Sequence, residues 1–258
     1  MANYSNVSEV NVSGSNLNFV YDSYGLPEDL ISVRFSKRAK RLLFRSSVAR
    51  GVEIVIPQGT HVSRIKDGVV RNLSWINAEY IKIVGIRANL NPDEISLKAL
   101  DEIWLVRYTR LDKIPNGFKS TGRRIITVGL DPNDIFFSVR NLQQWFHQKS
   151  KDTLIPWLKS LADKRQLQFA RITVRNQVSR WGSCSERGNI SLNRNLLFLS
   201  SHLVEYVLHH ELTHLSHMNH SRNFWSSFEE VLPSYHDLRQ ELKSFDPEHI
   251  PVWASYTP

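Results

Sequence analysis

Apolar residues in the first half of this 258-residue chain fall into short runs separated by charged and polar stretches. Short runs rich in Val, Ile and Phe are typical of β-strands. Such runs predict strands over residues 31–35, 41–48, 52–57, 103–108 and 124–129. After the third run the apolar positions recur at helical spacing, which predicts a helix over residues 60–83 despite the interior Gly68.

The second half of the chain carries longer amphipathic stretches. Residues 139–161 repeat apolar positions at helical spacing and predict a long helix that Pro156 bends or divides. Apolar runs at 172–174 and 190–192 predict two more strands. An almost wholly apolar helix is predicted over residues 203–215, with Ser200 or Ser201 as its N-cap, and another helix over residues 224–232.

Composition places the chain among water-soluble globular proteins. Hydrophobic residues make up 41% and charged residues 22% of the sequence. No apolar run approaches the ~20 residues that a membrane-crossing helix needs, so we expect no membrane association. The amino terminus lacks the basic and apolar segments of a signal peptide, and the single cysteine, Cys184, excludes an internal disulfide. Together these features predict a cytoplasmic protein.

One motif interrupts the predicted apolar helix of residues 203–215. It reads His210-Glu211-Leu212-Thr213-His214. Two histidines four residues apart project from one face of a helix, so both imidazoles can reach a single metal ion. The glutamate after the first histidine is placed to take a proton from a metal-bound water. The motif therefore predicts a hydrolase with one Zn²⁺ per chain, held by His210 and His214, with Glu211 as general base.

A third ligand has to come from outside this helical pair. His217 shares the face of the pair, but each helical turn moves a side chain about 5.4 Å along the axis, so three histidines in a row cannot surround a tetrahedral ion. His220 can approach from another side if the helix ends near Met218 and Asn219. Coordination geometry thus favours His220. The alternatives are His217, Glu229 and Glu230.

The residues around the motif form a wider pattern. It comprises Arg180-Trp181-Gly182-Ser183-Cys184-Ser185, Gly188 to Asn193, Tyr206-Val207 before the motif, and Asn219-His220-Ser221 and Phe224-Trp225 after it. This run resembles the YgjP-like family of metal-dependent hydrolases, which is related to the SprT-like and WLM metalloproteases. The resemblance implies a metallopeptidase with His210, His214 and His220 as zinc ligands and Glu211 as general base. The stretch 87–124 exceeds the usual amino-terminal part of that family.

Residues near the motif are candidates for contact with a substrate. Residues 188–193 alternate apolar and polar side chains, which predicts a strand with one polar face. In zinc peptidases an edge strand beside the metal helix pairs with an extended substrate. We therefore predict substrate contacts from this strand, from the preceding arginine, and from a downstream tyrosine that is suited to stabilising an oxyanion, a role for which the adjacent His236 is the alternative. These candidates are Asn189, Ser191, Asn193, Arg180 and Tyr235.

Two alternative functions remain open at this point. The same metal and base suit hydrolysis of a phosphoanhydride, as in a nucleotide pyrophosphatase or phosphohydrolase, and nearby arginines could bind phosphate. These are Arg171, Arg175, Arg180, Arg187 and Arg194. The net charge of +8 and the basic stretch 37–41 also allow a DNA-associated module in which the metal supports folding. A structural zinc, however, usually has four protein ligands.

The predicted elements give an α+β fold. A β-rich amino-terminal part precedes a zincin-like helix-and-sheet domain that carries the His-Glu-x-x-His motif on its central helix. We predict a flexible tail over residues 1–18, the β-rich part over 19–135, the hydrolase domain over 136–246 and an unstructured tail over 247–258. A peptide, a protein or a nucleotide is the expected substrate.

Overall fold

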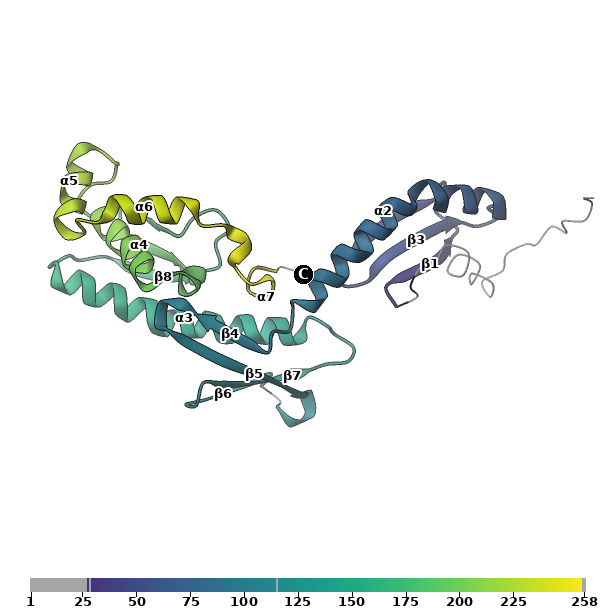
Figure 1. Ribbon diagram of the computed structural model, residues 1–258, viewed down its shortest axis with the longest axis horizontal. Helices are drawn as coiled ribbons and strands as arrows, with labels where there is room; N and C mark the ends of the chain where they lie inside the picture. Colours follow the sequence, from purple (N-terminus) through teal and green to yellow (C-terminus); the bar gives the residue numbers. More distant parts are fainter. Residues whose placement is uncertain (1–26, 28, 115, 257–258) are drawn as a thin grey trace, which may run out of the picture. The chain divides into compact units, whose positions relative to one another are not determined.

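The computed structural model describes residue 27, residues 29–114 and residues 116–256, and the predicted tail over residues 1–18 lies outside this part. Two compact units divide between Ala88 and Asn89. Mixed helices and small sheets make up both units (Figure 1), so the α+β class is confirmed.

A three-stranded sheet and one long helix form the first unit. The strands are β1 (Ile31–Ser36), β2 (Leu43–Ser47) and β3 (Gly51–Pro57), in the order β1-β3-β2. Strand β1 is parallel to β3, and β2 is antiparallel to it. Helix α2 (Val62–Ala88) buries Ile65, Val69, Ile76 and Ile83, which recur at helical spacing, against the apolar residues of β3. These strands and this helix match the predicted ones.

A four-stranded sheet opens the second unit. It contains β4 (Glu94–Leu97), β5 (Glu102–Arg110), β6 (Phe118–Thr121) and β7 (Ile125–Leu130), in the order β4-β5-β7-β6, with the short helices η1 (Lys98–Leu100) and η2 (Leu111–Lys113) between strands. Trp104 of β5 packs edge-on against Trp145 of helix α3 (Phe137–Lys164), with ring centroids 5.1 Å apart.

Because this sheet belongs to the second unit, the boundary between the two units differs from the predicted one. We expected a boundary between residues 135 and 136, but the structure places it between Ala88 and Asn89. The physical reason is the apolar face of the sheet: Ile95, Trp104, Val106 and Val128 belong to one buried cluster with the residues of α3 and of the later helices. The stretch 87–124 had no role assigned from the sequence; its part from Asn89 onward completes the core of the second unit.

Helix α3 runs without a break through Pro156, where the sequence predicted a bend or a second helix. Leu154, Leu158 and Leu161 lie on either side of the proline and are all buried in the same core. Because packing of this kind supplies most of the stability of a helix in a protein, it keeps the helix continuous although proline removes one backbone hydrogen bond. Figure 1 shows α3 between the four-stranded sheet and helices α4 and α6.

A second small sheet precedes the motif. It contains β8 (Arg171–Arg175), β9 (Gly182–Cys184) and β10 (Asn189–Asn193) in the order β8-β10-β9. The turn η3 (Arg194–Phe198) leads into α4 (Ser201–Thr213), and α5 (Arg222–Val231) and α6 (Tyr235–Ser244) follow. Buried apolar side chains from β8, β10, η3, α4, α5 and α6 join the core cluster of the second unit, and the half-buried Cys184 of β9 packs against it.

The end of the chain corrects another expectation. We predicted an unstructured tail over residues 247–258, but the structure shows η4 (Pro247–His249) and α7 (Val252–Ser255). Trp253 is only 1% exposed and packs against Phe146 and Phe198. The Gln143 amide donates hydrogen bonds to the carbonyls of Trp253 and Tyr256. Burial of one large aromatic side chain thus fixes a segment whose prolines suggested disorder. Within the described residues, no helix has the length and apolar character that crossing a membrane requires.

Candidate active site

Helix α4 positions the first histidine and the glutamate of the motif. Ser200 occupies its N-cap with extended backbone angles, as predicted, and His214 is its C-cap. The helix ends at Thr213, before Met218 and Asn219, because the next backbone amides fold back onto the last helical carbonyls. This early end leaves enough chain for His220 to return toward the motif.

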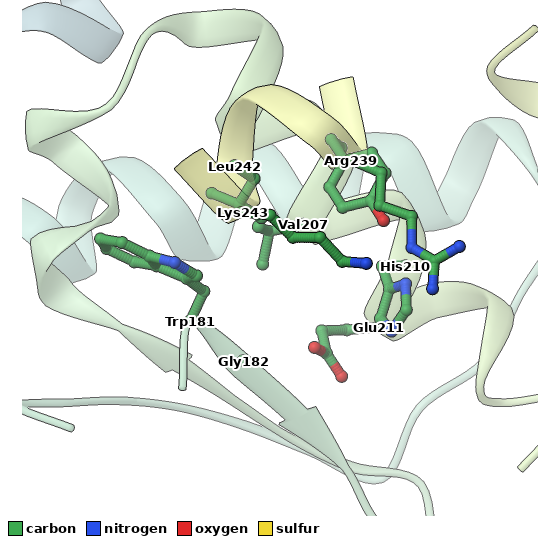
Figure 2. A pocket seen from close by; sticks show the side chains of 9 residues that line it. Trp181, Gly182, Val207, His210, Glu211, Arg239, Leu242 and Lys243 are labelled. Carbon is green, nitrogen blue, oxygen red and sulfur yellow. The ribbon is translucent and has the colours of Figure 1, made fainter. Parts of the chain in front are cut away.

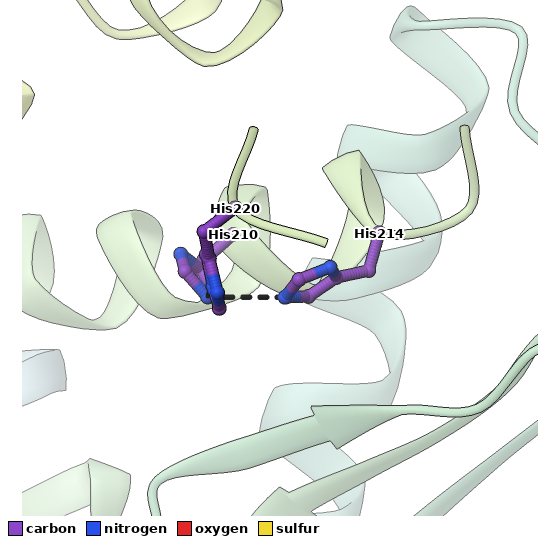
Figure 3. A group of neighbouring side chains, drawn as sticks. All are labelled: His210, His214 and His220. Atoms are coloured by element: carbon purple, nitrogen blue, oxygen red, sulfur yellow. Dashed lines mark hydrogen bonds between the residues drawn. The ribbon is translucent and has the colours of Figure 1, made fainter. Parts of the chain in front are cut away.

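Three imidazoles converge beside the last turn of α4 (Figure 3). The Nε2 atom of His210 lies 3.2 Å from Nε2 of His214 and 2.9 Å from Nε2 of His220. All three ligand atoms lie within 4.8 Å of one another. Tetrahedral zinc with Zn–N bonds of about 2.0–2.1 Å separates its nitrogen ligands by about 3.3 Å. The three residues therefore offer nitrogen donors at a spacing that suits one small cation.

Neighbouring groups hold these rings in place. The His214 Nδ1–H group is 3.0 Å from the carbonyl oxygen of His217, to which it can donate, and this directs Nε2 of His214 toward the cluster. Phe224 of α5 is fully buried, and its ring centroid lies 4.8–5.0 Å from those of all three imidazoles. The rings are thus packed against an apolar wall that fixes their orientation.

The alternative third ligands lie elsewhere. Nε2 of His217 is 3.1 Å from the hydroxyl of Ser227, so its ring is engaged outside the imidazole cluster. Glu229 and Glu230 are exposed residues of α5 and do not belong to the group of ligand atoms. Among the described residues, the geometric preference for His220 therefore agrees with the one cluster that contains both motif histidines.

Glu211 is buried beside this cluster, with 5% of its surface exposed. Burial raises the pKa of its carboxyl to about 8, and the positive charge of Arg180 opposes that rise. Its Oε2 atom has no hydrogen-bond partner within the described part of the chain. The other oxygen faces Gly182 so closely that a Cβ built there would lie 2.6 Å from Oε1. The absence of a side chain at Gly182 of β9 thus leaves the space that the carboxylate occupies, and we call this position the seat of the carboxylate.

Charge and protonation at the cluster suit a cation. Burial, together with the neighbouring His214, His220 and Arg239, lowers the pKa of His210 to about 3. Its ring is therefore neutral near pH 7, which is the form that binds metals. Two neutral imidazoles that face each other share at most one proton between their nitrogens, so lone pairs remain directed into the cluster. A cation would satisfy these lone pairs.

The predicted substrate strand has to be corrected. Strand β10 is the middle strand of its sheet, paired with β8 on one side and β9 on the other, so its backbone cannot receive a substrate. The buried Asn193 instead donates from Nδ2 to the carbonyls of Gln177 and Arg180, which fixes the loop before β9. Ser191 is half-buried and Asn189 is exposed on the same strand. Strand β9, which lies at the end of the sheet and contacts α4, takes the position expected for β10.

Of the two other predicted substrate-binding residues, Arg180 lies near Glu211 and Tyr235 lies outside the cavity. Arg180 is exposed and close enough to Glu211 to influence its pKa. Tyr235 is 5% exposed, and its ring stacks on that of Trp225 with centroids 5.3 Å apart. It therefore packs α6 against α5 and does not line the cavity beside the motif.

The arginines proposed to bind phosphate do not form one site. Arg194 is buried, and its guanidinium donates to the carbonyls of Gln143 and Ala254. Arg171 and Arg175 lie on β8, which β10 separates from β9. Among the five arginines, Arg180 is the one whose charge affects Glu211.

A cavity of about 320 Å³ adjoins His210 and Glu211 (Figure 2). Four of the other lining residues belong to the pattern already noted around the motif: Trp181, Gly182, Tyr206 and Val207. The remaining three come from α6 and carried no signal in the sequence: Arg239, Leu242 and Lys243. Arg239 and Lys243 are one helical turn apart, a spacing that puts both on one face of α6, but this signal has meaning only once α6 is known to cover the motif helix.

Comparison with known proteins places the chain in a family. Curated proteins give no significant match. A similar solved structure is the crystal structure of the metallopeptidase zymogen of Pyrococcus abyssi abylysin, which is 23% identical and covers 40% of this chain and 92% of that one. Its TM-score of 0.29 is too low to support a shared overall fold. The YgjP-like metallopeptidase domain matches residues 40–245. This span is most of the chain, which therefore belongs to the YgjP-like family of metallopeptidase domains, as its motif and surrounding residues indicated.

Proposed function

We propose that this chain is a zinc-dependent peptidase in which His210, His214 and His220 hold one Zn²⁺ and Glu211 is the general base. The observation that carries this proposal is the convergence of three imidazole nitrogens next to a buried carboxylate with an unpaired oxygen. Three nitrogen ligands leave a coordination position open, as catalytic zinc sites require. Membership of a metallopeptidase family supports a metal-dependent hydrolase independently of this geometry.

The chemistry follows from the position of Glu211. When bound, zinc supplies a Lewis acid and a water whose pKa is lowered to about 7. The carboxylate of Glu211 takes a proton from the attacking water and delivers it to the leaving nitrogen of the peptide bond. A base must be ionised, and burial works against ionisation here. Positive charge beside the carboxylate offsets that effect: Arg180 provides some of it, and a bound dication would add more.

The substrate is an extended peptide in this proposal. Strand β9 lies at the end of its sheet, next to α4, and Gly182 of this strand lines the cavity beside Glu211. Edge strands of a sheet bind peptides through main-chain hydrogen bonds, whereas neighbouring cavities accept individual side chains. A peptide paired with β9 would bring its backbone past Glu211.

Metal titration tests the proposal. The protein is stripped with a chelator, dialysed and supplied with Zn²⁺ in fractional equivalents while cleavage of unstructured fluorogenic peptides is followed. The proposal predicts no cleavage without metal and a plateau at one equivalent. Full peptide cleavage by the stripped protein would contradict it, and so would a restored protein that binds one Zn²⁺ but hydrolyses no peptide.

A further inference from the structure

The cavity beside the motif is lined by apolar side chains and by two cationic ones. Apolar side chains form its body: Trp181 at one end, Val207 from α4 and Leu242 from α6. Two cations, Arg239 and Lys243, come from α6, and Glu211 is the one acidic residue among the lining residues. Figure 2 shows both cationic side chains extending over the cavity toward His210. The cavity thus places positive charge directly beside the reacting groups.

The two cations are available to a ligand. No ion pair with a carboxylate is found for either one in the described part of the chain. Arg239 is half-buried, and its guanidinium lies 4.5 Å from the ring centroid of Trp225. Stacking of this kind orients a guanidinium and leaves its N–H donors free at the edge. Lys243 is exposed and adds a flexible ammonium one turn further along.

The positive charges of these side chains also act on the neighbouring imidazole cluster. Arg239 lines the same cavity as His210, and its guanidinium lies over the ring of Trp225, which is stacked on His220 with centroids 5.6 Å apart. Cations beside a site built for a dication repel the ion, and a bound anion offsets that repulsion. The volume of about 320 Å³ is at the small end of the range for ligand sites, roughly 300–1,000 Å³, and suits one amino-acid side chain or chain end.

We propose that Arg239 and Lys243 form a carboxylate-binding subsite that selects peptides with an acidic group next to the scissile bond. The carboxylate comes either from an Asp or Glu side chain or from the carboxyl terminus of the peptide. Arg239 binds it through paired N–H donors, Lys243 adds a second charge, and Trp181 and Leu242 contact the apolar part of the residue. This inference rests on the proposed peptidase function and adds the class of substrate.

A matched set of peptides tests the subsite. Quenched fluorescent peptides carry Glu, Gln or Lys at each position flanking the cleaved bond, and a second pair differs only in a free or amidated carboxyl terminus. We expect kcat/KM to be about tenfold or more higher for the acidic member, the size of effect associated with a hydrogen-bonded charge. Preference for internal Glu assigns the subsite to a side chain, and preference for the free terminus assigns it to the chain end.

Charge reversal on α6 separates recognition from folding. Lys243→Glu changes an exposed side chain, so we expect the fold to persist, the preference for Glu over Gln to disappear and cleavage of the Lys peptide to increase. Arg239→Gln should raise KM for the acidic peptide more than it lowers kcat. Lys159→Gln, an exposed change on α3, is the matched control and should retain the wild-type preference.

Two results overturn the inference and differ in meaning. Equal Glu211-dependent cleavage of all members of both peptide sets would leave the peptidase intact and remove the subsite. Absence of any Glu211-dependent peptide cleavage would remove the proposed function, and the subsite with it. Binding offers an independent readout: the Glu211→Gln protein should bind a labelled acidic peptide about tenfold more tightly than its Gln counterpart, and Lys243→Glu should abolish the difference.

Discussion

Gly182 faces the carboxylate of Glu211 with no room for a side chain. A Cβ at this position would lie 2.6 Å from Oε1, 2.8 Å from Cγ and 2.9 Å from Cδ of Glu211. To move from 2.6 Å to the 3.4 Å at which ordinary van der Waals contact begins, the carboxylate has to shift by about 0.8 Å. The backbone of Gly182 is outside the left-handed region, so Gly182→Ala introduces no strain in φ. The change therefore acts on the position of Glu211.

A displacement of about 1 Å in a reacting group can reduce the rate about 100-fold. We expect Gly182→Ala to lower kcat on a fluorogenic peptide by about that factor and to leave the zinc content unchanged, because the three imidazoles are not the groups displaced. Zinc is measured by mass spectrometry on the same samples. Gly122→Ala is the control, since a Cβ there meets no atom within 4 Å. A kcat within threefold of wild type would refute the idea that Gly182 seats the catalytic carboxylate.

Three further predictions test other parts of the structure. His220→Ala should lose bound zinc whereas His217→Ala should keep it, because the ring of His217 bonds to Ser227; equal zinc loss in both would argue against the ligand set. Trp253→Ala should lower the free energy of unfolding by about 3–5 kcal/mol in guanidinium titrations, since the side chain is 1% exposed; a loss below about 1 kcal/mol would mean that α7 is not anchored. Burial and the charge of Glu211 raise the pKa of Cys184 to about 11, so its thiol stays protonated at pH 8; alkylation should be slow there and accelerate toward pH 11, and rapid reaction at pH 8 would contradict this.

The sequence predicted the elements whose signal is local. Strands β1, β3, β5 and β7 and helix α2 follow from runs of apolar residues and from helical spacing. The motif histidines follow from a four-residue spacing, and His220 from the argument that a straight row cannot surround an ion. In each case the relevant distance is short along the chain, so the spacing itself carries the information.

Features that depend on tertiary pairing were missed. Strand β10 has the alternation of an edge strand, yet it pairs on both sides, because alternation does not show how many neighbours a strand has. Nothing local marks Gly182 as the seat of Glu211, which is far away in sequence. Arg239 reads as one more surface cation until α6 is placed against α4. Such residues can be assigned only after the fold brings distant segments together.

The most direct test of the central claim is the turnover of zinc-loaded wild type beside Glu211→Gln, on unstructured peptides and on nucleoside triphosphates in parallel. Glutamine keeps the shape of the side chain but cannot accept the proton. The account predicts equal zinc content in the two proteins, peptide cleavage by wild type, and a rate about 10²–10⁴-fold lower in the variant. Undiminished peptide cleavage by Glu211→Gln would contradict it. Glu211-dependent release of phosphate or pyrophosphate with no peptide cleaved would contradict it equally, and would assign the site to nucleotides.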